Sequence, residues 1–198
     1  YFTLSPMGKA RTVLEATTGT FLSFLPSPPN RKITLDEECN LLAATGLFPN
    51  TQVLDSSKTK GLLYPQFVGT VNDAIAKNDV NGLIAICKGL FEQLEKVHSM
   101  GWVHQNITND TLFLSSDDKV YLTGFDGAKK EVKKSAQELD IRLLGQTLEE
   151  VVWNFRLIHS RRHDQQLQNL EGLLKGAYKT SGIAEILKTL NAILPSKS

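Results

Sequence analysis

The sequence has little of several features that would assign it to a class at once. Only two of its 198 residues are cysteines, Cys39 and Cys87, too few for a disulfide framework or a four-ligand zinc site. No apolar run approaches the roughly 18 to 20 residues that cross a bilayer, so no membrane span is expected. Because 22 Lys and Arg face 21 Asp and Glu, the net charge is +1, and nucleic-acid binding gains no support.

What is present is the composition of an ordinary folded domain. Apolar residues make up 41% of the chain and charged residues 22%, which is enough for one core and argues against wholesale disorder. The chain begins at Tyr1, so a signal peptide cannot be judged, and both a secreted and a cytoplasmic protein are compatible with it. The two cysteines fall on expected helices, which favours buried free thiols; an interhelical disulfide is the alternative.

The first third of the chain predicts short strands and one helix. Thr34, followed three residues later by Glu37, has the pattern of a capping box and opens a helix over 34–46. Pro65 is expected to end a strand or to mark an edge strand. The expected strands cover 1–4, 11–16, 20–25, 52–55 and 61–67.

The remainder of the chain predicts mostly helices. Apolar residues recur at helical spacing over 83–98 and 136–155, with two short extended segments, 111–114 and 119–123, between them. The tail over 165–194 reads as helical, with breaks near Gly172, Gly176 and Gly182. A β-rich first third and an α-rich remainder predict an α+β fold with two lobes, 1–68 and 69–198.

The most informative stretch is 97–114, VHSMGWVHQNITNDTLFL, together with VYLTGFD at 120–126. A helix ends in Val97-His98, a short strand leads to His104, and a loop and an apolar triplet follow. This order resembles the catalytic region of protein kinases, where a His-Arg-Asp loop with a downstream Lys and Asn precedes an Asp-Phe-Gly motif.

Other segments fall in the order that this resemblance requires. Glu38, with Leu42 four residues on, resembles the helix of the kinase small lobe, and Tyr64 lies near the hinge. The segment 139–145 resembles the central helix of the large lobe, whose Asp, here Asp140, braces the catalytic loop. The resemblance covers about 4–155 and implies a bilobal protein kinase-like fold, with a small β-rich N-lobe and a mostly helical C-lobe. It gives structural roles to His104, Phe125 and Asp140.

The residues that carry kinase chemistry are replaced at each matching position. Asn106 stands where the catalytic Asp takes the substrate proton, and an amide is no base near neutral pH. Thr108 matches the phosphate-contacting Lys. Thr111 and Gly124 match the metal-binding Asn and Asp, so the magnesium ligands are lost. Leu25 matches the strand lysine that pairs the nucleotide phosphates.

The glycine-rich loop is also degraded, because only Gly8 remains of it. About a dozen residues separate Gly127 from Asp140, and no Ala-Pro-Glu sequence appears, which argues against peptide phosphorylation. The resemblance therefore implies a pseudokinase, which is not an enzyme and holds neither a metal nor a cofactor. Such a protein would bind protein partners and act as a scaffold or an allosteric regulator.

Two other functions stay open for the same cleft. One is a pseudokinase that holds ATP as a structural ligand, with Gly8, Glu38 and Asp126 as candidate contacts. The other is unusual transfer chemistry at His104, Asp110 and Asp126, of which the two carboxylates are also candidates for a displaced metal. The simpler interpretation is that Asp110 and Asp126 are solvated loop carboxylates and that His104 is a structural histidine.

A finer resemblance concerns Tyr64-Pro65 and the segment 120–126. Both are similar to the rhoptry kinase and pseudokinase family of apicomplexan parasites. That likeness implies secretion into the parasite vacuole, its wall or the host cell, and a virulence factor; a structural component of a vacuole or cyst wall is a further alternative.

Several other residues invite a functional role but fit a structural or solvent-facing one. His98 is expected to pack at a helix end. The indoles of Trp102 and Trp153 are expected in the core. The basic residues expected to face solvent are Lys129, Lys130, Lys133, Lys134, His159, Arg161, Arg162 and His163.

Overall fold

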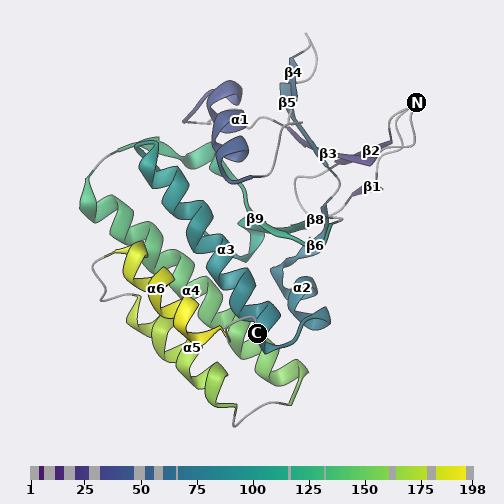
Figure 1. Ribbon diagram of the computed structural model, residues 1–198. Coiled ribbons are helices and arrows are strands. Elements are labelled where there is room, and N and C mark those ends of the chain that lie inside the picture. Colours follow the sequence, from purple (N-terminus) through teal and green to yellow (C-terminus); the bar gives the residue numbers. More distant parts are fainter. Residues whose placement is uncertain are drawn as a thin grey trace.

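The chain combines a helical body with small antiparallel sheets, as the computed structural model shows (Figure 1). It describes residues 5–6, 12–15, 21–26, 32–46, 52–55, 60–65, 67–115, 117–131, 133–160, 164–177 and 182–194, with side chains described for 32–46 and from 68 onward. Strands dominate the first third and helices the remainder. The predicted α+β class is therefore confirmed.

The first sheet is antiparallel and lies beside helix α1 at the top of Figure 1. Among the described residues it has the order β1-β2-β3-β5-β4. The predicted strands over 11–16, 20–25 and 52–55 are confirmed to within about a residue, whereas the one over 1–4 lies outside the described residues. The strands are β1 (Ser5–Pro6), β2 (Thr12–Glu15), β3 (Phe21–Pro26), β4 (Gln52–Asp55) and β5 (Lys60–Pro65).

The strand predicted over 61–67 is confirmed as far as Pro65, and so is the expectation that Pro65 ends a strand. Strand β5 ends at Pro65, and a separate strand, β6 (Phe67–Thr70), pairs with β8 (Leu112–Ser115) in another sheet. Proline has no backbone N–H for a ladder, so Pro65 is a natural point for the pairing to change. The second sheet has the order β6-β8-β9 and is completed by β9 (Val120–Leu122), which confirms the extended segments predicted near 111–114 and 119–123.

Helix α1 (Leu35–Ala44) begins as its sequence predicts. The Thr34 hydroxyl accepts a hydrogen bond from the Glu37 N–H at 3.2 Å, and the Glu37 carboxylate accepts one from the Thr34 N–H at 2.8 Å. This reciprocal pair satisfies two backbone donors at the helix start. The helix buries Glu38, Leu41 and Leu42.

The helical body is built around α3 (Val80–Ser99), which lies against α4, α6 and β9. The body also contains α4 (Lys134–Ile158), α5 (Gln165–Gly176), α6 (Ile183–Ile193) and α2 (Val71–Lys77), of which α2 lies against α4. The helices predicted over 83–98 and 136–155 are confirmed, and each extends a few residues further. The predicted break at Gly172 is wrong, because this residue lies within α5, where its neighbours leave open space.

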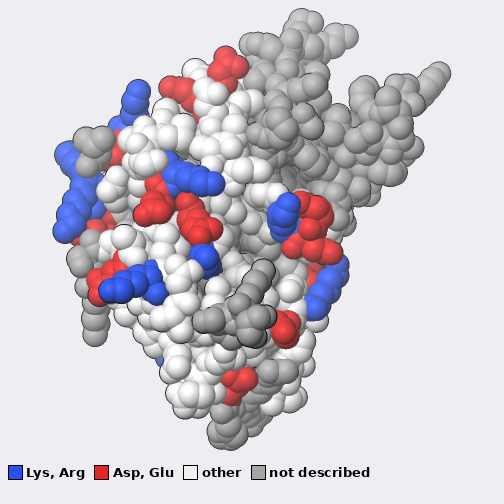
Figure 2. Space-filling view, viewed as in Figure 1, with Lys and Arg blue, Asp and Glu red and all other residues white. Residues whose placement is uncertain are grey.

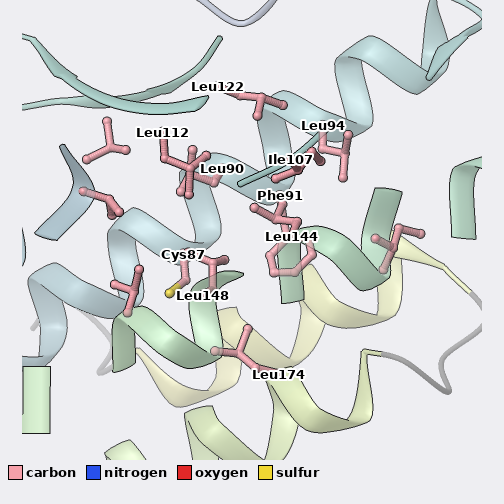
Figure 3. Packing of buried hydrophobic residues seen from close by; sticks show 14 of the residues in the cluster. Cys87, Leu90, Phe91, Leu94, Ile107, Leu112, Leu122, Leu144, Leu148 and Leu174 are labelled. Carbon is pink, nitrogen blue, oxygen red and sulfur yellow. The ribbon is translucent and has the colours of Figure 1, made fainter. Parts of the chain in front are cut away.

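One continuous core joins the helices to the second sheet, and Figure 3 shows its centre. In that view Cys87 of α3 lies next to Leu148 of α4, and Leu122 of β9 lies above α3 on the side of Leu90 and Leu94. The buried Gln93 side chain connects the two layers, since it donates to the Val120 carbonyl at 3.0 Å and accepts from the Leu122 N–H at 2.8 Å. The position of the second sheet on α3 is thus fixed by hydrogen bonds as well as by apolar burial.

The cysteines and tryptophans divide between core and surface. Burial raises the pKa of the Cys87 thiol to about 12, whereas Cys39 is only half-buried. The two thiols do not form a disulfide, so that alternative is wrong. Trp102 is buried, as predicted, in β7 (Trp102–Val103). The prediction for Trp153 is wrong: its side chain is 58% exposed, because it is rotated away from the side of α4 that carries Val152 and Phe155 into the core.

Charges are mixed on the face that Figure 2 shows, where Lys and Arg alternate with Asp and Glu. Lys129 and Lys130 form the short strand β10 (Lys129–Lys130), which pairs with β7, and both side chains are exposed, as are Lys133 and Lys134. The solvent-facing position predicted for His159 is wrong, because its ring is half-buried and donates to the Ile75 carbonyl at 3.2 Å. The other basic residues of that predicted patch, 161–163, lie outside the described residues.

Within the described residues, none of the helices combines the length and the apolar character that crossing a membrane requires.

Candidate functional site

The candidate site is the loop that follows β7, and one buried carboxylate of α4 holds it. Asp140 is fully buried, and its two oxygens accept hydrogen bonds from the backbone N–H groups of His104 and Gln105, each at 2.7 Å. The His98 Nε2 atom lies 3.0 Å from Asp140 Oδ2. Gln105 adopts a φ of +66°, a conformation that a non-glycine residue rarely takes without such support.

The ring of His104 is fully buried, and both of its nitrogens are occupied. Its Nε2 lies 2.8 Å from the Thr123 carbonyl, which can only accept, so Nε2 carries the proton. Its Nδ1 accepts from the Asn106 N–H at 3.3 Å, and the ring lies 4.6 Å from that of Phe125. This arrangement leaves neither nitrogen open to act as a base.

Burial lowers the pKa of His104 below its ordinary value, although the Thr123 carbonyl and the nearby carboxylates of Asp140 and Asp126 oppose the shift. The folded protein therefore holds the ring neutral, whereas the unfolded chain protonates it near pH 6.5. Since the unfolded state then binds more protons, this contribution to stability is complete above about pH 6.5 and is lost as the pH falls toward the lower, folded pKa.

We therefore expect the unfolding free energy to decrease as the pH falls below about 6.5, with a slope of at most ~1.4 kcal/mol per pH unit from this one group. Urea unfolding between about pH 7.5 and 5 measures it. His104→Gln, which cannot take up a proton in this range, should remove this part of the slope. An unchanged slope in His104→Gln would mean that another group causes the pH dependence.

Two other positions of the site are in direct contact. The Thr111 hydroxyl accepts from the Thr108 N–H at 3.0 Å and donates to the Thr108 carbonyl at 2.9 Å. Gly124 has a φ of +78°, and a Cβ atom placed on it would lie 2.8 Å from the Thr111 methyl carbon. The Thr111 methyl thus occupies the space that a side chain at position 124 would need, and its hydroxyl is already committed to the loop backbone.

The other predicted site residues lie around this contact. Asn106 is exposed, and Asp126 is half-buried in a short 3-10 turn whose residue Phe125 is buried. The Asp126 carbonyl accepts from the Lys32 N–H at 3.0 Å, which connects this turn to the segment leading into α1. Glu38 is buried on α1, the helix that also contacts this turn.

The remaining candidates are less informative. Leu25 pairs with Leu62 of β5 in the first sheet, and its side chain is not described; Gly8 lies outside the described residues. Asp110 is exposed at the other end of the loop. Among the described residues, no three of His, Cys, Asp and Glu gather closely enough to hold a metal ion.

Sequence reasoning missed a hollow of about 350 Å³ between the loop and α4. Loop residues 107–110 form one wall, and Leu143, Gln146, Thr147 and Glu150 form the other. No sequence signal reveals it, because the two walls come from segments that are far apart in the chain. It also missed the approach of His98 to Asp140, which depends on the packing of α3 against α4.

No protein-family model matches the chain, and no curated protein matches its sequence.

Proposed function

We propose that this chain is a pseudokinase: a bilobal protein kinase-like domain, with 1–68 as the N-lobe and 69–198 as the C-lobe, that binds proteins and does not transfer phosphate. The order of elements supports this proposal, because a small antiparallel sheet and α1 precede the helical body. A second support is that β7, the loop after it and the hairpin β8–β9 follow one another along the chain in the order that the resemblance requires. The hydrogen bond from the His104 N–H to the Asp140 carboxylate also supports the proposal, because the resemblance implies that this Asp braces the loop.

The observation that carries the proposal is the contact between Thr111 and Gly124. Phosphotransfer needs magnesium ions held by oxygen ligands at these two positions. Gly124 offers no side chain, and the Thr111 hydroxyl is committed to the Thr108 backbone. Asn106, at the position of the base, offers an amide, which accepts no proton near neutral pH. Three elements of phosphotransfer are therefore missing together.

The first test is incubation with ATP labelled on its γ-phosphate, with magnesium or manganese and a general acceptor protein. We expect no label on the acceptor or on the chain itself. An active kinase assayed in parallel confirms that the acceptor and the ATP are competent. Labelling that persists in the purified chain and disappears in Asp126→Asn would contradict the proposal.

A thermal melt with ATP distinguishes a vacant cleft from one that holds a nucleotide. We expect no rise in Tm that depends on the metal, since the two ligand positions lack suitable oxygens. A ligand at a hundredfold excess over its Kd stabilises the folded state by about 2.7 kcal/mol, which a melt detects easily. A clear rise would favour the pseudokinase that holds ATP as a structural ligand.

The finer resemblance at Tyr64-Pro65 and 120–126 extends the proposal to a secreted factor of an apicomplexan parasite, of the rhoptry type. Fractionation of the native protein tests this part. Recovery with secretory organelles, vacuole or host cell supports it, whereas recovery with the cytosol contradicts it. Recovery in an insoluble vacuole or cyst wall would favour a structural component.

A further inference from the structure

The loop after β7 contains two adjacent acceptor triplets for N-linked glycosylation. They are NIT at 106–108 and NDT at 109–111, in which Asn is followed two positions later by Thr with no proline between. No other Asn of the sequence has this pattern. Such a triplet can receive an oligosaccharide on the Asn amide when the chain enters a secretory pathway. The structure distinguishes the two triplets.

The first triplet presents its polar side chains to solvent. Asn106 and Thr108 are exposed, whereas Ile107 between them is 2% exposed and belongs to the core shown in Figure 3. Asn106 is held through its backbone N–H, which donates to His104 Nδ1 at 3.3 Å. Within the described part of the chain, no hydrogen bond of the Asn106 side-chain amide is found. A sugar on Asn106 Nδ2 therefore extends into solvent without displacing a contact.

The second triplet is committed to the fold. The Asn109 Nδ2 atom donates to the Glu150 carboxylate at 2.9 Å, and its Oδ1 atom is buried. Thr111 is 6% exposed, and its hydroxyl donates to the Thr108 carbonyl. A sugar on Asn109 Nδ2 would have to lie between the loop and α4 and would remove the hydrogen bond to Glu150. The folded protein has no room for a glycan there.

We propose that Asn106 is an N-glycosylation site of the secreted chain and that the folded protein carries no glycan at Asn109. In the reaction a bond forms between Asn106 Nδ2 and C1 of the first sugar of a lipid-linked oligosaccharide. The bond from C1 to the lipid diphosphate breaks, the diphosphate leaves with the electron pair, and the amide proton passes to a base of the cell's oligosaccharide transferase. This inference rests on the proposed function, because only secretion brings the chain to this enzyme.

Folding selects between the two triplets. The transferase acts on the entering chain, before α4 has packed behind the loop, so both triplets are then open to it. A sugar on Asn106 leaves the hydrogen bonds from His104 and Gln105 to Asp140 intact. A sugar on Asn109 instead obstructs the approach of α4. Chains that reach the folded state therefore carry the glycan on Asn106.

A glycan at this place also deepens the proposed function. Asn106 stands at the position that the resemblance gives to the catalytic base, and a bulky, solvated oligosaccharide would cover the loop around it. A partner protein then has to bind elsewhere on the surface. The glycan thus adds a second obstacle to phosphate transfer, besides the missing ligands at Thr111 and Gly124.

The test expresses the full chain behind a cleavable secretion signal in cultured eukaryotic cells. The mass of the secreted protein is measured before and after treatment with peptide N-glycosidase, and we expect the loss of one glycan. Because this enzyme converts the carrier Asn to Asp, tandem mass spectrometry of the loop peptide then locates the site at Asn106. A secreted chain without a glycan, or with its glycan on Asn109, would overturn the inference.

Variants assign the signal to the first triplet. Asn106→Gln and Thr108→Ala should each abolish the mass loss, whereas Thr108→Ser, which keeps the hydroxyl, and Asn109→Gln should retain it. Lys133→Asn creates an acceptor triplet with the exposed Ser135, so adding it to Asn106→Gln should restore one glycan and shows that the cells are competent. Circular dichroism checks that each variant is folded. A glycan that persists in Asn106→Gln, or disappears in folded Asn109→Gln, contradicts the inference.

The native protein separates the failure of this inference from the failure of the proposed function. Native protein recovered with secretory organelles, vacuole or host cell should lose a glycan from Asn106 on the same treatment. Recovery there without a glycan overturns the site and leaves the proposed secretion standing. Recovery with the cytosol contradicts the proposed secretion, while a glycan on Asn106 of the expressed chain still supports the site.

Discussion

Replacing Asp140 with Ala is expected to lower the free energy of unfolding by about 3–5 kcal/mol. The substitution removes the acceptor for two buried backbone donors, those of His104 and Gln105, and leaves His98 without its carboxylate neighbour. It also leaves the positive φ of Gln105 unsupported. Since a folded domain is typically stable by only 5–15 kcal/mol, a loss of this size is a large fraction of the total. Urea unfolding followed by circular dichroism measures it.

Two companion variants show whether the loss comes from these hydrogen bonds. Asp140→Asn keeps one carbonyl oxygen at nearly the same volume, so its cost should lie between zero and that of Ala. Asp79→Ala removes an exposed Asp that accepts only from the Gly82 N–H at the start of α3, which should cost about 1 kcal/mol. Equal costs for Asp140→Ala and Asp79→Ala would mean that Asp140 does not hold the loop.

Gly124→Ala is expected to lower the free energy of unfolding by about 2–4 kcal/mol. Its backbone has a φ of +78°, which disfavours any L side chain, and the new Cβ would lie 2.8 Å from the Thr111 methyl carbon. The same crowding applies to Gly124→Asp, the substitution that would return a metal-binding acid to this position. A restored motif is therefore expected to destabilise the fold before it restores any chemistry. Denaturant unfolding of both variants measures this effect.

A double-mutant cycle separates the two causes. Thr111→Ser removes the methyl group and retains the hydroxyl that bonds the Thr108 backbone, so Gly124→Ala should cost less in the Thr111→Ser background. The backbone cost at position 124 should remain. Gly89→Ala, within α3 and with open space around it, is the glycine control and should be neutral or slightly stabilising. Additive costs at 111 and 124 would show that the two side-chain positions do not compete for space.

The sequence predicts the local elements well, because their signals are local. The capping box at Thr34 and the apolar spacing within α3 and α4 need only neighbouring residues, and both predictions are confirmed. The prediction of a buried Trp153 is wrong because this residue follows two buried valines in an apolar stretch. Only the packing of α4 shows which side of that helix faces outward. The strand predicted over 61–67 is confirmed up to Pro65, and only its last part was assigned wrongly, since Phe67 belongs to a strand of a different sheet.

The geometry of the candidate site is harder to predict from the sequence, because each of its contacts joins two segments that are distant in the chain. His104 and Asp140 could be assigned to a loop and a helix, but the hydrogen bonds between them depend on how α4 meets β7. The contact of Gly124 with Thr111 likewise needs the pairing of β8 with β9. The hollow beside Glu150 lies between two segments that are distant in the chain, and a pattern within one segment cannot predict such a space.

The Asp140 hydrogen bonds have a consequence for the order in which the chain acquires its structure. Their partners lie 35 and 36 residues before Asp140, so the conformation of the loop is not encoded in its own segment. During synthesis the loop leaves the ribosome well before the residue that shapes it, and contacts across such sequence separations form slowly. The loop therefore reaches its final form only after α4 has docked, and any change that delays this docking prolongs the time for which the loop backbone lacks its partner.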